Sequence, residues 1–240
     1  MNYIDLGIAV IFVFFVLLGY YEGFLQSVFS VVAFFLSWLG AAVGTHWLSA
    51  YLRSFDKVYD ALLYYAEGAE MLKSVEHAKL NITRLYADEL SSIISQSSIP
   101  SPVDNIVAKN IASEAFKEFD IVTLGDYVNR TIVNYTINII SFVIIFFVIR
   151  LILEFIIKGV DAIKPLPVLA HFDSVLSSGV SLVRAFFAVF VIFMAVPIVL
   201  LLLPSGGTFS SSFVRNYIDE SFFGSFFYNS NFLLSLISGV

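Results

Sequence analysis

Residues that could carry out catalysis are few in this sequence, and they do not form an arrangement that a reaction needs. The three histidines, His46, His77 and His171, are scattered and lack the spacing of metal ligands. The chain has no cysteine, which excludes thiolate chemistry, disulfides and cysteine metal sites. Residues 179–183 place Ser181 without the second glycine of a nucleophile elbow. We therefore predict no catalytic residue, no metal site, no cofactor and no enzymatic activity.

Charged side chains do not form a recognisable binding site either. Asp5 and Glu22 lie at opposite ends of one apolar segment, so they cannot act as a catalytic pair. The net charge is −6 and the basic residues form no run, which excludes nucleic acid as a partner. We place no charged residue at mid-depth in any apolar segment, which argues against proton-coupled transport and voltage sensing.

One polar helix face is the most suggestive chemical feature. Asn134, Asn138 and Ser141 follow one another at steps of four and three residues, so they share a face. In a membrane such side chains either form interhelical hydrogen bonds or line a polar path. We favour the hydrogen bonds, and the polar path is the alternative.

Small residues form two stripes that indicate close helix packing, because lipid supplies no hydrophobic drive between helices. Gly40 and Gly44 form a Gly-xxx-Gly motif that serves either an oligomer interface or packing within one chain, against the first or the fourth apolar segment. We favour packing within one chain. Pro197 predicts a kink in the last segment. The predicted packing residues are Ser30, Ala33, Ser37, Gly40, Gly44, Ser177, Ser181 and Ala185.

The elements that carry these residues are membrane helices. Hydrophobic residues make up 59% of the 240 residues and charged residues only 13%, a balance that a soluble fold of this size could not bury. A membrane helix needs about 20 mainly apolar residues. Four segments qualify, at about residues 4–21, 24–52, 132–157 and 183–203. We predict an all-α polytopic membrane protein with these four spans and a helical extramembrane region between spans two and three.

The spans divide the chain into four parts. Residues 1–52 form a first transmembrane hairpin and residues 53–130 an extracytoplasmic helical cap. Residues 131–204 form a second transmembrane pair with a cytoplasmic link, and residues 205–240 an interfacial aromatic tail. Thr123 and Asp126 resemble a capping box, so the third helix is expected to start before its span.

The distribution of positive residues sets the orientation. Arg150, Lys158, Lys164 and Arg184 cluster around the link between spans three and four, which places that link in the cytoplasm. Both termini and the acidic cap then face outward. Arg150, Glu154, Lys158 and Asp161 alternate in charge along one helix face, which is typical of a solvated helix end. The alternative is a docking surface for a cytoplasmic partner.

Three stretches resemble the colicin V production protein family. The first comprises Asp5 near the start and residues 19–24 at the hairpin, where Glu22 takes the place of the family's usual arginine. The second comprises residues 172–187, where Ser177, Ser181, Arg184 and Ala185 stand at positions of small and basic residues. Ser221 resembles a recurrent serine of the tail. The family positions carried over are Asp5, Gly19, Gly23, Phe24 and Arg184.

The resemblance implies a multi-pass protein of the bacterial inner membrane that takes part in toxin production or export and in envelope maintenance. We therefore expect a non-enzymatic accessory protein or scaffold, with the lipid bilayer and either an envelope protein or further copies of itself as partners. The alternative is a small oligomeric channel or transporter, with Asn134, Asn138 and Ser141 lining its pore and Gly40 and Gly44 holding its subunits together.

Overall fold

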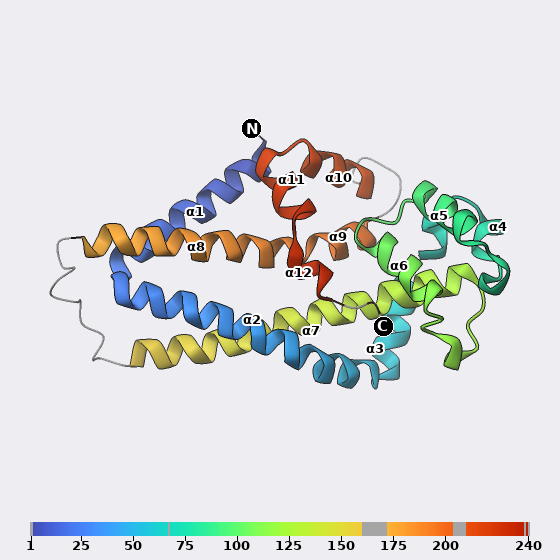
Figure 1. The fold of residues 1–240 in the computed structure, drawn as a ribbon, viewed down its shortest axis with the longest axis horizontal. Coiled ribbons are helices and arrows are strands. Elements are labelled where there is room, and N and C mark those ends of the chain that lie inside the picture. The colour runs from blue at the N-terminus through green and yellow to red at the C-terminus, as the bar shows by residue number, and fades with distance from the viewer. Residues whose placement is uncertain (1, 67, 160–171, 204–209, 238, 240) are drawn as a thin grey trace. The chain divides into compact units, whose positions relative to one another are not determined.

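The computed structural model describes residues 2–66, 68–159, 172–203, 210–237 and 239, and within these ranges the regular structure is helical (Figure 1). An isolated bridge between Asn81 and Thr123 is the one β pairing in the described part of the chain. The predicted all-α fold is confirmed.

Four helical segments are long and apolar enough to cross a membrane, which confirms the predicted number of spans. They are α1 (Tyr3–Glu22), α2 (Phe24–Arg53), α7 (Leu124–Gly159) and the segment Asp173–Leu202. α7 starts well before its apolar stretch, as the capping box predicts. The Asp126 amide donates to Thr123 Oγ1 at 3.2 Å, and that hydroxyl donates to the Asp126 carboxylate at 2.5 Å.

The last of these segments starts earlier than predicted and is broken near its end. It consists of α8 (Asp173–Phe193) and α9 (Val196–Leu202). Pro197 lies in the first turn of α9, where its missing amide hydrogen leaves no helical hydrogen bond unmade. The proline therefore separates two helices at the position where the sequence predicts a kink.

Local capping explains where α1 begins and ends. The Asn2 side chain accepts hydrogen bonds from the Ile4 and Asp5 amides, and the Asp5 carboxylate accepts one from the Asn2 amide. Gly23 ends the helix with φ +81°, a conformation that favours glycine, and α2 starts at the next residue. Glu22 is thus the last residue of α1, and the hairpin turn is Gly23 alone.

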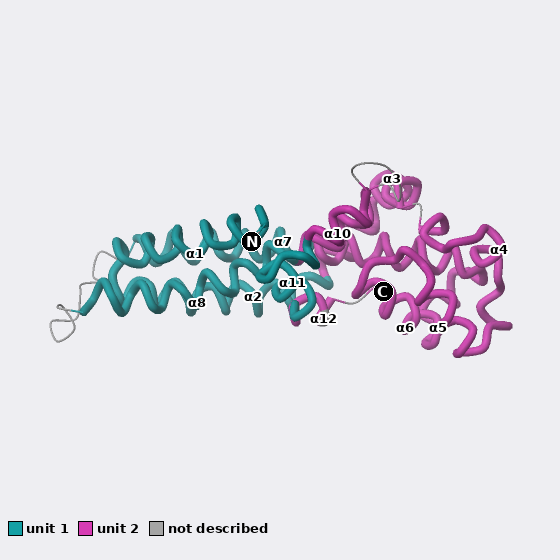
Figure 2. Tube along the Cα trace, turned by 90° about the horizontal axis from the view of Figure 1, so that it is seen from above, with its two compact units in different colours: residues 1–46, 141–193, 218–231 teal, residues 47–140, 194–217, 232–240 magenta. Residues whose placement is uncertain are grey.

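The chain forms two compact units, coloured separately in Figure 2. Unit 1 comprises residues 1–46, 141–193 and 218–231 and contains α1, α8, α11 (Phe222–Asn229) and parts of α2 and α7. α1 packs along α8, and α11 packs against both. Phe34 of α2 lies at the centre of this unit, with the rings of Phe146 and Phe187 at 5.1 and 6.1 Å.

Unit 2 comprises residues 47–140, 194–217 and 232–240. Its short helices are α3 (Asp56–Ala66), α4 (Val75–Ala78), α5 (Ala87–Gln96), α6 (Val103–Ala112), α10 (Ser211–Asp219, which ends within unit 1) and α12 (Phe232–Ser235). The start of α7 supplies much of its core, since Leu124, Tyr127 and Val128 are at most 1% exposed. This unit contains the segment that the sequence predicts to be a helical cap.

Candidate functional site

α1 and α8 approach each other closely at Gly19. A Cβ atom at Gly19 would lie 2.7 Å from the backbone oxygen of Ser177 and 2.7 Å from Cβ of Ser181. Both serines are fully buried, and the Ser181 hydroxyl donates to Ser27 Oγ of α2 at 3.4 Å. Small residues that lie far apart in the sequence therefore bring three helices together.

The hairpin turn is held by the first residue of α8. Asp173 Oδ1 accepts a hydrogen bond from the Phe24 amide at 3.2 Å and so satisfies one of the free amides at the start of α2. A Cβ atom at Gly23 would lie 2.8 Å from Asp173 Oδ2, so the glycine allows this approach as well as the turn. Gly23 and Phe24 thus position the hairpin against α8.

A buried ion pair joins the end of α1 to α8. Arg184 Nη1 lies 3.1 Å from Glu22 Oε2, and the two side chains are 2% and 12% exposed. Side chains on a helix lean toward its N-terminus, and α1 and α8 run in opposite directions, so these two lean toward each other. The Arg184 guanidinium also lies over the Phe15 ring, 5.1 Å from its centroid.

The position of Arg184 corrects one expectation. From the sequence we placed it at the start of the last span, expected at about residues 183–203. α8 starts at Asp173, so Arg184 lies about three turns inside the helix and is buried. The apolar stretch alone does not reveal this, because the first two turns of α8 are rich in serine.

A second set of charges lies on α7. Arg150 Nη2 is 3.2 Å from Glu154 Oε2, and Lys158 Nζ is 3.0 Å from Glu154 Oε1. Lys158 is 60% exposed, but Arg150 is only 15% exposed. The alternating pairs are therefore not uniformly solvated, since Arg150 at their start is largely shielded from solvent. Asp161, expected on the same helix face, and Lys164, expected in the positive cluster of the link, lie outside the described residues.

A cavity of about 400 Å³ is lined in part by charged side chains of α7 and α8. Its lining includes Arg150, Glu154 and Arg184 together with phenylalanine side chains of α1, α2 and α7. Nε and Nη2 of Arg184 and Nη1 of Arg150 are buried and have no hydrogen-bond partner in the described part of the chain. Because a buried donor left unpaired costs about 1–3 kcal/mol, this cavity stands out chemically.

Asp5 connects the start of the chain to its tail. Its Oδ1 accepts hydrogen bonds from the Ser221 hydroxyl at 2.7 Å and from the Phe223 amide at 3.0 Å. Ser221 in turn caps α11 by accepting from the Gly224 amide at 2.8 Å. A single buried carboxylate thus helps to cap the N-termini of both α1 and α11.

Residues 4–77 match the colicin V production protein family. The resemblance inferred from the sequence is confirmed over this segment, which includes α1, α2 and α3. No curated protein and no solved structure matches the chain.

The segment that matches the colicin V production family carries only one half of the contacts made by Asp5, Gly19 and Gly23. Asp5, Gly19 and Gly23 lie inside the matched residues, whereas their partners on α8 and in the tail lie outside it. The structure therefore explains these positions by packing, because each one contacts a side chain or a helix from the second half of the chain.

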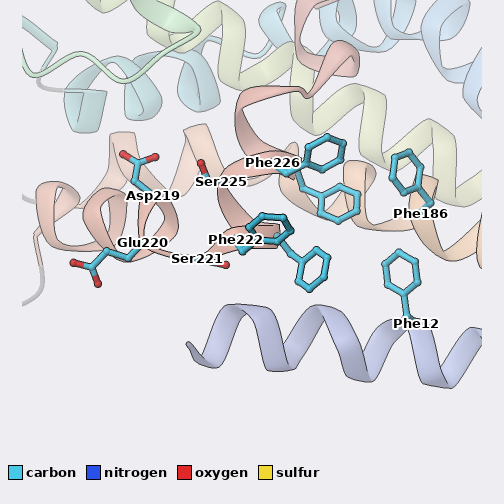
Figure 3. A pocket seen from close by; sticks show the side chains of 10 residues that line it. Phe12, Phe186, Asp219, Glu220, Ser221, Phe222, Ser225 and Phe226 are labelled. Atoms are coloured by element: carbon cyan, nitrogen blue, oxygen red, sulfur yellow. The ribbon is translucent and has the colours of Figure 1, made fainter. Parts of the chain in front are cut away.

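Aromatic residues of α11, in the tail, pack onto α1 and α8. Figure 3 shows Phe222 and Phe226 of α11 facing the same pocket as Phe12 of α1 and Phe186 of α8. Phe227 is 2% exposed, and its ring lies 4.9 Å from that of Phe190. Residues 218–231 of the tail therefore belong to unit 1, although Phe222 at the rim of this pocket remains 79% exposed.

The small-residue stripe of α2 packs within the chain. A Cβ atom at Gly40 would lie 2.5 Å from Ile149 Cδ1, and one at Gly44 3.0 Å from Ile145 Cδ1. Both isoleucines belong to α7, whereas the sequence analysis considered the first and fourth spans as partners. The remaining predicted packing residues are buried: Ser30, Ala33, Ser37, Ser177, Ser181 and Ala185.

The polar face of α7 is buried throughout. Asn134, Asn138 and Ser141 are 4%, 3% and 0% exposed. Asn138 Oδ1 accepts a hydrogen bond from Arg53 Nη2 at 2.9 Å, and Arg53 also donates to Ser49. At Asn138 the face therefore makes a helix-to-helix hydrogen bond, between the end of α2 and the middle of α7.

Sequence reasoning missed a cation that lies among aromatic rings in unit 2. The Arg130 guanidinium lies 3.6 Å from the centroid of the Phe119 ring and within 6 Å of the Phe116 and Tyr59 rings. Burial raises the pKa of Tyr59, and the charge of Arg130 acts against that shift. The spacing of Phe116 and Phe119 is the one local signal in the sequence for this aromatic cluster. Tyr59 joins it only through the tertiary fold.

The contacts described above hold helices together. Among the described residues, no group of three or more His, Asp or Glu side chains could hold a metal ion. The carboxylates of Asp5 and Glu22 each contact a different partner.

Proposed function

We propose that this chain is a non-enzymatic accessory protein or scaffold of the colicin V production type, acting in toxin production or export and in envelope maintenance. The observation that supports it most is the role that the motif residues play in the fold. Asp5, Gly19 and Gly23 are occupied by contacts with the tail and with α8. Residues that hold a fold together suit a protein that acts by association.

The alternative, a small oligomeric channel, has less support from the geometry. A pore lining of Asn134, Asn138 and Ser141 would need an accessible face, yet all three side chains are buried and Asn138 binds Arg53. Gly40, proposed to join subunits in that alternative, packs against Ile149 of the same chain.

The proposed location is the bacterial inner membrane, with both termini extracytoplasmic. The positive side chains Arg150, Lys158 and Arg184 belong to unit 1, which also holds the Gly23 turn. Positive residues near span ends favour the cytoplasmic side. Unit 2 would then present its short helices outside the cytoplasm.

Native mass spectrometry of the full chain, extracted mildly from its own cells, tests the scaffold proposal. We expect a second protein in a stoichiometric complex. Lys158→Glu should weaken that complex if the partner docks at the exposed end of α7. Lys117→Glu is the matched control, because Lys117 is an exposed lysine that also pairs with a glutamate, at 2.6 Å, but in unit 2.

The outcomes separate the two functions. A second protein that co-purifies at fixed stoichiometry supports the scaffold and identifies the partner. A pure homo-oligomer that conducts ions or solutes after reconstitution contradicts it and supports the channel. Loss of the complex with Lys117→Glu but not with Lys158→Glu would place the docking surface on unit 2.

A further inference from the structure

We propose that the cavity between α1, α7 and α8 binds an acidic membrane lipid, whose phosphate group pairs with Arg184 and Arg150 while an acyl chain lies against the phenylalanine walls. All lining residues belong to unit 1, and Figure 1 labels the three helices.

The main support for this proposal is an edge of the Arg184 guanidinium that has no hydrogen-bond partner among the described residues. Glu22 occupies Nη1, while Nε and Nη2 are buried and have no hydrogen-bond partner in the part of the chain that the structure describes. These two nitrogens lie on one edge of the planar guanidinium and donate in parallel. That edge fits two oxygens of one phosphate or carboxylate group.

Arg150 supplies a third donor to the same cavity. Its Nη1 is buried and lacks a hydrogen-bond partner among the described residues, while Nη2 pairs with Glu154. Glu154 also lines the cavity, and a carboxylate there would repel an anion. Both of its oxygens are already paired, one with Arg150 and the other with Lys158. The guanidinium nitrogens that remain unpaired would therefore bind a ligand group that only accepts hydrogen bonds.

The balance of charge also favours an anion. The ion pairs at the cavity connect three cations, Arg150, Lys158 and Arg184, with two carboxylates, Glu22 and Glu154. One positive charge is left over. In a membrane, where an isolated charge is costly, a lipid phosphate can neutralise it.

The apolar walls indicate that the anion carries a hydrocarbon chain. Phe34, Phe146 and Val191 form a buried wall, whereas Phe14 and Phe147 are 57% and 58% exposed on the surface of unit 1. A cavity of 400 Å³ has room for about thirteen water-sized groups, each with a share of roughly 30 Å³. A free inorganic anion would leave most of this apolar space unfilled.

The test uses the full chain, purified in detergent and stripped of lipid. Native mass spectrometry then measures adducts with dioleoyl-phosphatidylglycerol, dioleoyl-phosphatidylcholine and inorganic phosphate. We expect phosphatidylglycerol to bind about tenfold more tightly than phosphatidylcholine, because both carry a phosphate group but only phosphatidylglycerol has a net negative charge to neutralise the cavity's surplus positive charge. Inorganic phosphate should neither bind measurably nor displace the lipid.

Three variants locate the site. Glu22→Gln with Arg184→Gln removes the donor edge without leaving an unpaired buried charge, and should reduce phosphatidylglycerol binding by about tenfold. Ala188→Phe fills the cavity and leaves every charge in place, so it should reduce binding even if the double variant misfolds. Lys117→Gln is the matched control, because it removes an exposed lysine of unit 2 that takes no part in the ion pairs at the cavity, and should change binding by less than about twofold.

Several results would overturn the proposal. Equal binding of the two lipids would show that the guanidinium edge does not select the headgroup. Displacement of phosphatidylglycerol by inorganic phosphate would assign the site to a free anion. Unchanged lipid binding in Ala188→Phe would place the lipid elsewhere on the protein.

Discussion

Replacing Gly19 by alanine should open the contact between α1 and α8. The added Cβ would lie 2.7 Å from a backbone oxygen and 2.7 Å from the Ser181 Cβ. Non-bonded heavy atoms normally sit about 3.5–4.0 Å apart, so the helices must separate by about 1 Å or distort. Backbone atoms cannot swing aside as the end of a long side chain can, so the cost should approach that of overpacking a core, about 1–3 kcal/mol.

Gly7→Ala is the matched control, because Gly7 lies on the same helix and a Cβ there meets nothing within 4 Å. Both variants gain the helix propensity of alanine, about 0.8–1 kcal/mol over glycine. That gain cancels when the two variants are compared. Gly7→Ala should therefore be more stable than Gly19→Ala by about 1–3 kcal/mol.

The assay is reversible unfolding of the purified chain in mixed micelles, followed by helical circular dichroism as the denaturing detergent is increased. Disulfide cross-linking between α2 and α8 provides a second readout, because separated helices should react more slowly. If the two alanine variants unfold at the same detergent fraction, Gly19 does not sit in a close helix contact and the reasoning fails.

Three further predictions concern the same framework. Asp5→Ala and Ser221→Ala should each speed amide hydrogen exchange across α11. A double-mutant cycle of the two should give a coupling energy of about 1–3 kcal/mol, since the carboxylate makes a charge-assisted hydrogen bond with the Ser221 hydroxyl. A coupling energy near zero would show that this hydrogen bond does not join α1 to α11. Gly23→Ala should destabilise the chain by about 1–3 kcal/mol in the same unfolding assay, because φ is +81° and Asp173 crowds the new Cβ; a neutral effect would contradict this turn. In intact cells, an impermeant maleimide should label Val75→Cys but not Lys158→Cys, and the opposite pattern would reverse the proposed orientation.

The spans were predictable because they depend on local composition alone. A membrane helix needs a continuous apolar stretch, and the described part of the chain shows four. The early start of α7 was also predictable, since Thr123 and Asp126 interact across three residues. The start of α8 was not, because serine-rich turns precede its apolar part and contact the other helices of unit 1.

The contacts that define the candidate site could be predicted only in part. The motif positions Asp5 and Gly19 were found from their resemblance to a family, but their partners come from distant parts of the chain. The pairing of Glu22 with Arg184 spans 162 residues, and no local spacing encodes it. The family's usual arginine at the hairpin gives way to Glu22 here, and the structure shows what the acidic residue does: it pairs with a buried arginine.

The central claim is that the hairpin of the matched segment packs against α8 through small residues. Cross-linking Ser27→Cys with Ser181→Cys in native membranes tests it most directly. The two hydroxyl oxygens lie 3.4 Å apart, and the chain has no cysteine of its own, so the background is nil. Mild oxidation should form an intramolecular disulfide, which needs Cβ atoms about 3.5–4.5 Å apart, and should protect both thiols from a polyethylene-glycol maleimide. Ser27→Cys with Leu182→Cys, on an exposed neighbouring position, should stay modifiable, whereas faster cross-linking of that control pair would contradict the account.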